Sequence, residues 1–191
     1  MNGYGNHNGD IIIAGETYST DFPVTPGVVK SNYDGRYCDI SISRFNSDQS
    51  DLVFSTYFGG NSYDYFNDMD IDEDGNIYVT GHTISKDLPT TAGAMNETSN
   101  ICNVTTPYGD DDISTDIYVT KISSSGSSLL YSTFLGGRDY EYYPFLAVDN
   151  SNNAFVSGTT YSTDFPIKYG YDDVFEGDSE FFLTKINDQG S

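Results

Sequence analysis

The chain has 191 residues, among them 29 acidic and only 8 basic side chains, and its formal net charge is −21. This charge would repel phosphate backbones and anionic lipid surfaces, which excludes nucleic acid as a partner and argues against direct membrane insertion. The 17 Tyr and 12 Phe residues, the lack of Trp and the absence of any long Ala-, Leu-, Glu- or Lys-rich stretch favour an all-β protein.

The opening MNGYGNHNGD lacks the charged and apolar regions of a signal peptide, and no apolar run reaches membrane-spanning length. We therefore expect that the chain as given neither spans a membrane nor directs its own export.

Three segments align without gaps, and each predicts a strand followed by a loop. They are GDIIIAGETYSTDFP (9–23), GNIYVTGHTISKDLP (75–89) and NNAFVSGTTYSTDFP (152–166). Their centres are β-branched or aromatic and are bounded by Gly, Asn or Asp, as in short strands. Repetition of this kind is typical of structural units that stack on copies of themselves.

Three further sets of segments complete the repeat. They are DISISRFNSDQ (39–49), DIYVTKISSSG (116–126) and EFFLTKINDQG (180–190); LVFSTYFGG (52–60) and LLYSTFLGG (129–137); and DMDIDEDG (68–75) and LAVDNSN (146–152). No segment has helical periodicity, and each unit would contain four short strands. Arg44, Lys121 and Lys185 share one position in the second set, and we expect each to pair with a nearby carboxylate.

Four-stranded antiparallel sheets of this size, stacked radially, are the blades of a β-propeller. We predict blade 1 at 1–67 with strands B, C and D, blade 2 at 68–144 with all four strands, and blade 3 at 145–191 with strands A, B and C. Two and a half to three blades form an incomplete ring, because a propeller typically needs four to eight. Terminal sheets would then present uncovered faces and edges.

Blade 2 is longer than blade 1 through an inserted loop at about 96–112. The loop contains Cys102 and two N-x-T sequons, at Asn96 and Asn103, which could accept glycans in a secreted protein or could arise by chance. A disulfide between Cys38 and Cys102 is one alternative, and two free thiols are the other.

Two phrases, DEDGNIYVTGHTISKDLPTTAGA and DIYVTKISSSGSSLLYSTFLGG, resemble the SBBP repeat, a β-propeller repeat of large secreted or surface-anchored bacterial and archaeal proteins. The resemblance extends over essentially the whole chain in three registers. It implies a propeller module outside the cell or at its surface, which is the localisation we expect.

The sequence offers little for catalysis. A Ser-His-Asp hydrolase needs a histidine, and the two present are His7, near the N-terminus, and His82, whose repeat counterparts are Glu16 and Thr159. Carboxylate pairs are uninformative in so acidic a chain. We predict no enzymatic activity and no required cofactor.

Calcium is the one cation that the sequence suggests. Asp68, Asp70, Asp72 and Asp74 alternate before Gly75, as at the start of a calcium loop. In a calcium loop counted from Asp70, however, the position of the bidentate glutamate is Gly81. Of the four aspartates, the next repeat keeps only the counterpart of Asp72, which is Asp149. A strand with alternating Asp on one face explains the same pattern, so both readings stay open.

These observations favour a non-catalytic extracellular module with a structural or adhesive role, within a larger chain or in an oligomeric or filamentous assembly. Its partners would be copies of itself or further blades of a parent protein. The alternative is a module that binds glycan or protein through loops with exposed aromatics such as Tyr140, Tyr142 and Tyr143. A weaker alternative is the scaffold of a secreted hydrolase.

Overall fold

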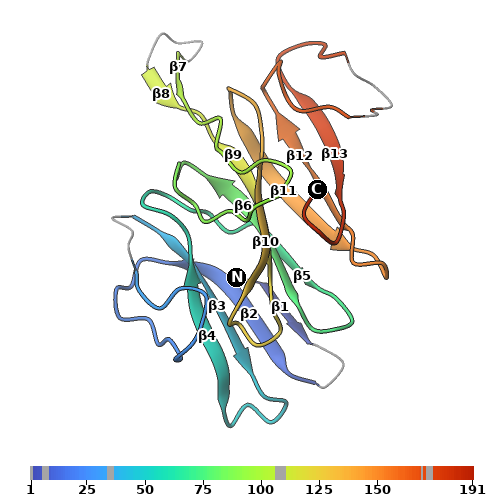
Figure 1. Cartoon of the computed structure of the whole chain (residues 1–191). Coiled ribbons are helices and arrows are strands. Elements are labelled where there is room, and N and C mark those ends of the chain that lie inside the picture. The colour runs from blue at the N-terminus through green and yellow to red at the C-terminus, as the bar shows by residue number, and fades with distance from the viewer. Residues whose placement is uncertain (1, 6–8, 34–36, 106–110, 169, 171–173) are drawn as a thin grey trace.

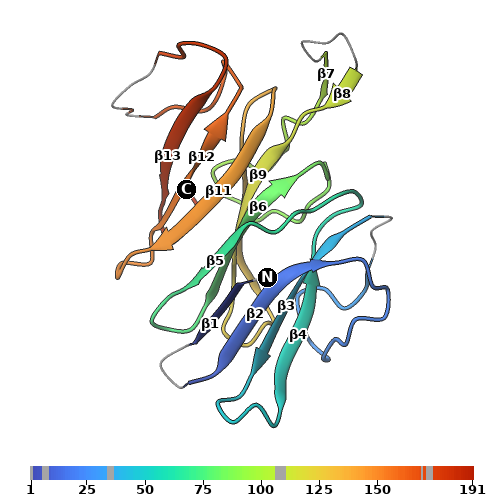
Figure 2. The ribbon, with the colours of Figure 1, turned by 180° about the vertical axis from the view of Figure 1, so that it is seen from behind.

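The computed structural model describes residues 2–5, 9–33, 37–105, 111–168, 170 and 174–191. These described residues contain strands and no helix, and the strands form antiparallel sheets, as predicted. Three of the sheets lie side by side as a stack of blades (Figures 1 and 2). The blades do not close into a ring.

Blade 1 is a four-stranded sheet rather than the predicted three-stranded one. Its strands, in spatial order, are β1 (Asn2–Gly5), β2 (Ile11–Thr17), β3 (Asp39–Phe45) and β4 (Leu52–Phe58). The prediction that the chain starts at strand B was wrong, because β1 pairs with β2 as a strand A. The Asn- and Gly-rich β1 has no apolar alternation, but ladder hydrogen bonds need only its backbone.

Blade 2 has the four strands predicted, in the spatial order β10-β9-β6-β5. They are β5 (Asp68–Ile71), β6 (Ile77–Thr83), β9 (Asp116–Ile122) and β10 (Leu129–Leu135). The inserted loop lies between β6 and β9. It contains a separate hairpin of β7 (Asn103–Thr105) and β8 (Asp111–Ile113), which was not predicted.

Blade 3 has the three strands A, B and C predicted. They are β11 (Glu141–Val148), β12 (Ala154–Thr160) and β13 (Glu180–Ile186). The predicted boundary at residue 145 falls inside β11 and was misplaced. The strand begins earlier because Glu141 and Tyr142 already pair with Thr160 and Thr159 of β12. The backbone N–H of Glu141 also donates to the Thr115 carbonyl of blade 2 (3.2 Å), which ties this end of β11 to the preceding sheet.

Side chains of successive blades form two apolar cores. One lies between blades 1 and 2 and includes Ile42 and Val79; the other lies between blades 2 and 3 and includes Tyr78 and Val156. Neighbouring residues of β6 therefore point into different cores, and β9 is buried along its whole length. This two-sided burial explains why alternation is weak in the middle blade.

The outer edges of β4 and β10 are covered by the loop that follows strand B in the same blade. The N–H of Thr25 donates to the Ser55 carbonyl (3.0 Å), and the N–H of Thr91 donates to the Ser132 carbonyl (3.1 Å). Covered edges avoid unwanted strand pairing. No strand pairs with the outer edge of β13 among the described residues.

Candidate functional site

The repeated loop after strand B binds the turn that ends the preceding blade. We call residues 17–21, 83–87 and 160–164 the turn-binding loops, and residues 59–62 and 136–139 the Gly-Gly turns. Junction 1 joins blades 1 and 2, and junction 2 joins blades 2 and 3. Both junctions contain one filled turn-binding loop.

At junction 1 the loop accepts two backbone hydrogen bonds from the turn. The N–H of Asn61 donates to Asp87 Oδ1 (2.9 Å), and the N–H of Ser62 donates to Ser85 Oγ (2.9 Å). The Asp87 carboxylate and the Ser85 hydroxyl thus satisfy two backbone N–H groups of the turn.

Junction 2 repeats this arrangement residue for residue. The N–H of Arg138 donates to Asp164 Oδ1 (2.9 Å), and the N–H of Asp139 donates to Ser162 Oγ (2.8 Å). The phrase is therefore repeated because each copy has the same task, the attachment of one blade to the next.

A buried carboxylate completes each junction. Asp64 accepts hydrogen bonds from Thr83 Oγ1 (2.5 Å), Ser85 Oγ (3.0 Å) and the N–H of Gly60 (2.7 Å). Its counterpart Glu141 accepts from Thr160 Oγ1 (2.7 Å). Each acid lies four residues after the second glycine of its turn.

The glycines allow the backbone of the turn to approach the loop closely. A β-carbon on Gly60 would lie 2.6 Å from both Asp87 Oδ1 and Ser85 Cβ. On Gly137 it would overlap Ser162 and lie 2.5 Å from Asp164 Oδ1. No larger residue fits either position without displacing the loop.

A second carboxylate faces the first in each junction. A β-carbon on Gly59 would lie 2.7 Å from Asp64 Oδ2 and 3.0 Å from Asp39 Oδ1, so the two acids converge there. Asp116 and Glu141 converge in the same way on Gly136.

Burial raises the pKa of Asp64 at junction 1 and of Asp116 and Glu141 at junction 2. It raises the pKa of Asp64 to about 6, even though Thr83, Gly60 and Ser85 donate to its charged form. It raises the pKa of Asp116 and that of Glu141 to about 7. Asp116 Oδ1 is buried and accepts no hydrogen bond from the part of the chain that the structure describes.

The two junctions differ in the residue that binds the acid at the start of strand C. At junction 1 Lys30 Nζ contacts Asp39 Oδ2 (3.0 Å) and the Gly59 carbonyl (2.9 Å). At junction 2 the uncharged Asn100 takes this place: its N–H donates to Asp116 Oδ2 (2.7 Å), and its Nδ2 donates to the Gly136 carbonyl (2.9 Å). Junction 2 thus has an amide where junction 1 has an ammonium group.

The aspartates of the predicted calcium stretch do not converge on one point. Asp68 Oδ2 accepts the N–H of Leu146 (3.1 Å), and Asp70 Oδ2 accepts the N–H of Val148 (2.8 Å), both on β11 of the next blade. Among the described residues no three acidic, His or Cys side chains form a group that could hold a metal ion. Asp68 and Asp70 thus lie on one face of β5, as in the alternative of aspartates along a strand, whereas Asp72 follows the strand.

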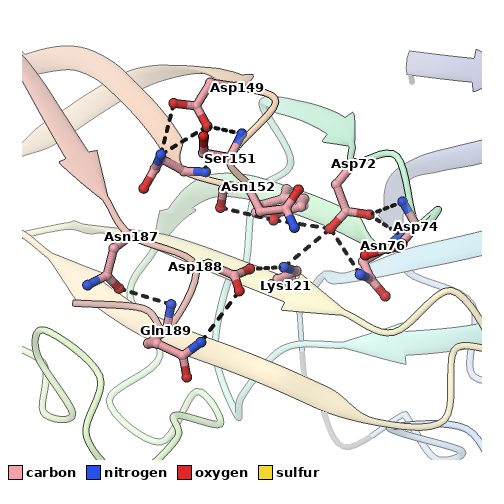
Figure 3. Close-up of polar contacts among 12 residues, drawn as sticks. Asp72, Asp74, Asn76, Lys121, Asp149, Ser151, Asn152, Asn187, Asp188 and Gln189 are labelled. Atoms are coloured by element: carbon pink, nitrogen blue, oxygen red, sulfur yellow. Dashed lines mark hydrogen bonds and ion pairs between the residues drawn. The ribbon is translucent and has the colours of Figure 1, made fainter.

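Asp72, the third aspartate, is turned to a different partner (Figure 3). Its carboxylate closes the turn that follows β5 by accepting the N–H of Asn76 (2.8 Å), and it pairs with Lys121 Nζ (3.2 Å). Burial opposes its charge, but these hydrogen bonds and the ammonium outweigh burial and hold the pKa of Asp72 below its usual value. Asp74 is exposed, and its N–H also donates to Asp72.

The expected ion pairs of the basic residues are present for Lys121 and for Arg44, which contacts Asp10 (2.6 Å). Lys121 also contacts Asp188, at the turn after β13 of the next blade (Figure 3). Lys185 lies over the ring of Phe155, 5.5 Å from its centre.

The cysteines are free thiols, so the disulfide alternative was wrong. Cys38 is buried at the start of β3 and donates to the Asp64 carbonyl (3.4 Å). Cys102 lies in the inserted loop of blade 2 and contacts the Arg138 carbonyl (3.2 Å). The two thiols thus belong to different junctions.

The two sequons differ in accessibility. Asn96 is half-buried, and its backbone is tied to β10 through the N–H of Phe134 (3.0 Å). Asn103 is exposed at the start of β7.

His82 is a half-buried neighbour of aromatic rings. Its ring stacks on Tyr65 with 4.5 Å between centres, and its Nδ1 lies 3.0 Å from Asn67 Oδ1. Burial lowers the pKa of His82 to about 4, so the imidazole is neutral near pH 7. His7 lies outside the described residues.

Aromatic residues form a continuous row across the three blades. Tyr63 and Tyr65, in the segment between β4 and β5, stack on each other. The His82 ring contacts both Tyr65 and Tyr142, and Tyr142 stacks on Tyr140. The ends of the row are the most exposed, with Tyr37 and Tyr161 both 41% and Tyr143 67% exposed. The three tyrosines named from the sequence are therefore neighbours, although Tyr140 and Tyr142 are only half exposed.

None of the described residues belongs to a helix that is long and apolar enough to cross a membrane.

A comparison with models of known protein families finds a match, which covers the first junction. Residues 53–89 match the SBBP family, described as a beta-propeller repeat. The matched segment runs from β4 through the Gly-Gly turn, β5 and β6 to the filled turn-binding loop of junction 1. A search of curated proteins finds no match. The chain thus carries a beta-propeller repeat of the SBBP family, and the matched unit contains both halves of a blade junction.

Proposed function

We propose that the chain is a non-catalytic module of an extracellular or surface-exposed β-propeller with a structural or adhesive role, completed by further blades of the same repeat type. The matched family is a structural repeat, and the structure is a stack of sheets held by repeated junctions. The acidic surface and the exposed sequon at Asn103 fit a location outside the cell.

One internal comparison carries this proposal. Ile117 and Val119 on β9 are fully buried where blade 3 covers them. The residues at the same repeat positions of blade 3, Phe181 and Leu183, are 72% and 68% exposed. Large side chains whose counterparts are covered by the next blade suggest that a further blade covers them as well.

The same face of blade 3 is more apolar than the covered face of blade 2. Phe145 and Ala147 occupy the positions of Asp68 and Asp70, and Phe145 is 64% exposed. Phe145 pairs with Ser157, which in turn pairs with Leu183, so these side chains share one side of the sheet. A sheet packed there would exclude water from an apolar surface.

The test is the effect of charge on this face. We expect the isolated chain to bind a hydrophobic dye and to self-associate as its concentration rises, as measured by size-exclusion chromatography with light scattering. Phe181→Asp combined with Leu183→Asp should reduce both effects. Leu130→Asp is the control, since Leu130 is also exposed (46%) but lies at the start of the outer strand of blade 2. A monomeric chain that binds no dye would contradict the proposal.

A second candidate is glycan binding at the aromatic row, which is favoured by the exposed rings of Tyr37, Tyr143 and Tyr161. Tyrosines combine a flat apolar face with a hydroxyl, which suits sugar rings. Binding to a glycan array that is lost in Tyr143→Ala and Tyr161→Ala but kept in Phe181→Ala would support it. Binding that all three variants keep would place the ligand elsewhere.

A further inference from the structure

The turn-binding loop of blade 1 has the internal structure of the two filled loops. In each loop the threonine Oγ1 accepts the N–H of the serine two residues later, at 3.2 Å for Thr17, 2.8 Å for Thr83 and 3.0 Å for Thr160. Loop 17–21 therefore has the conformation that, in blades 2 and 3, presents the hydroxyls and the carboxylate to a Gly-Gly turn.

Among the described residues, however, no Gly-Gly turn donates to loop 17–21. Ser85 and Ser162 are 0% and 1% exposed because a turn lies against them, whereas their counterpart Ser19 is exposed. Neither the Ser19 hydroxyl nor the Asp21 carboxylate accepts a hydrogen bond from another described residue.

Tyr57, on β4 of the same blade, holds loop 17–21 in place. Its hydroxyl donates to the Ser19 carbonyl (2.8 Å) and accepts the N–H of Phe22 (2.9 Å), and the rings of Phe22 and Tyr57 are 5.9 Å apart. Blade 2 has Phe134 at the position of Tyr57 and so lacks this hydroxyl. Contacts within blade 1 thus fix the conformation of loop 17–21 in the absence of a turn from the described residues. A site that is already ordered binds its partner at a lower entropic cost.

The filled loops define the occupant. Each receives two N–H groups after a Gly-Gly pair and a carboxylate four residues beyond the second glycine, as Asp64 and Glu141 provide. The sequence contains two Gly-Gly pairs, and both are engaged by blades of this chain. A second copy would have to open one of its own junctions to supply a turn.

We infer that residues Thr17, Ser19 and Asp21 form a binding site for the Gly-Gly turn of a further blade of the same repeat type, one that is not among the three described. This inference rests on the proposed function, since it names the group through which the additional blade attaches. Asp21 and Ser19 would accept the two N–H groups of the turn, and the Thr17 hydroxyl would donate to its carboxylate.

A cyclic peptide with the sequence of residues 57–64, YFGGNSYD, tests the site in the complete chain. Titration to about 5 mM would mostly fill a site with a Kd near 1 mM. We expect saturable shifts in the amide NMR signals of Ser19 and Asp21, and none at Ser85 or Ser162, whose loops are filled. The double variant Ser19→Ala, Asp21→Ala should weaken binding at least tenfold, while Thr20→Ala, a change to an exposed neighbour, should not.

The outcomes separate this inference from the proposed function. A peptide with Ala at both glycines should not bind, and equal binding of the two peptides would overturn the inference, as would unchanged signals at Ser19 and Asp21. If the apolar face of blade 3 behaves as proposed while no peptide binds, only the inference fails. If the peptide binds and the chain shows no dye binding or association, only the proposed function fails. Self-association that Ser19→Ala and Asp21→Ala abolish would identify a second copy as the occupant and overturn the inference.

Discussion

Asp116 of blade 2 and Glu141 of blade 3 direct their carboxylates at the same glycine, Gly136. Both acids are fully buried, and none of the described residues donates a hydrogen bond to Asp116 Oδ1. The place that the Lys30 ammonium has at junction 1 is taken here by the uncharged Asn100. Two buried carboxylates in one site favour the state in which at least one is protonated. Junction 2 therefore depends on pH.

The chain should be more stable at pH 5 than at pH 8. Burial raises the pKa of Asp116 and Glu141 to about 7, above the values of about 3.9 and 4.3 in an unfolded chain, so the folded state binds more protons between these limits. The stability they confer is complete below about pH 4 and is lost as pH rises through 7. We expect the free energy of unfolding, measured by urea denaturation, to fall by on the order of 2 kcal/mol between pH 5 and pH 8.

The variant Glu141→Gln separates this effect from general charge repulsion. The amide can still accept from Thr160 and can donate to Asp116, so the variant should lose part of the pH dependence between 5 and 8 and be more stable than the parent at pH 8. A parent chain that gains stability toward pH 8, or a variant with the same dependence, would refute a role of the acid pair.

Ser85→Ala should destabilise the chain more than the same change at the equivalent Ser19. Ser85 is buried between Asp64 and the N–H of Ser62, and its loss removes the acceptor of the Ser62 N–H and one of the donors to Asp64, at a cost of about 1–2 kcal/mol. Ser19 is exposed, so the cost there should stay below about 0.5 kcal/mol. Equal changes in the free energy of unfolding would mean that the filled loop contributes nothing specific.

Gly137→Ala should open junction 2. A β-carbon there overlaps Ser162 and approaches Asp164, which would displace the loop and break the hydrogen bonds from Arg138 and Asp139, at a cost of about 3 kcal/mol. Gly27→Ala is the control, because Gly27 has free space and only a positive φ of 77°, which costs about 1 kcal/mol. Thermal unfolding of the two variants gives the comparison, and similar midpoints would contradict it.

Much of the fold follows from the repeats, because strands B, C and D are apolar in every copy and their phrases align. β1 was missed because Asn2–Gly5 carries no apolar pattern and is held by backbone pairing alone. The hairpin of β7 and β8 was missed for a similar reason, since it lies in a loop without a repeat counterpart.

The junction acids could have been found in the alignment. Asp39, Asp116 and Glu180 begin strand C in all three repeats, and an acid follows each Gly-Gly pair at the same spacing. In so acidic a chain these acids do not stand out, and the run from Asp68 to Asp74 has a more regular spacing. Spacing along a strand does not say whether a carboxylate meets a cation or, as Asp68 and Asp70 do, the backbone of the next blade.

Lys121→Met should cost about 3 kcal/mol or more, because it leaves the buried carboxylate of Asp72 without its cation. Lys185→Met changes the equivalent lysine, which lies over Phe155 on the uncovered face of blade 3, and should cost less than about 1 kcal/mol. Urea denaturation at pH 7 measures both. Equal losses would show that burial by the next blade does not matter to this lysine.

Hydrogen exchange of β9 and β13 tests most directly the claim that each sheet is protected by the blade that covers it. In dilute, monomeric chain, the amides of Ile117–Lys121, covered on both sides, should exchange at least about 100 times more slowly than those of Phe181–Lys185 at the same repeat positions. Equal protection of the two strands in the monomer would contradict the account, because blade 3 would then be stable without a further blade.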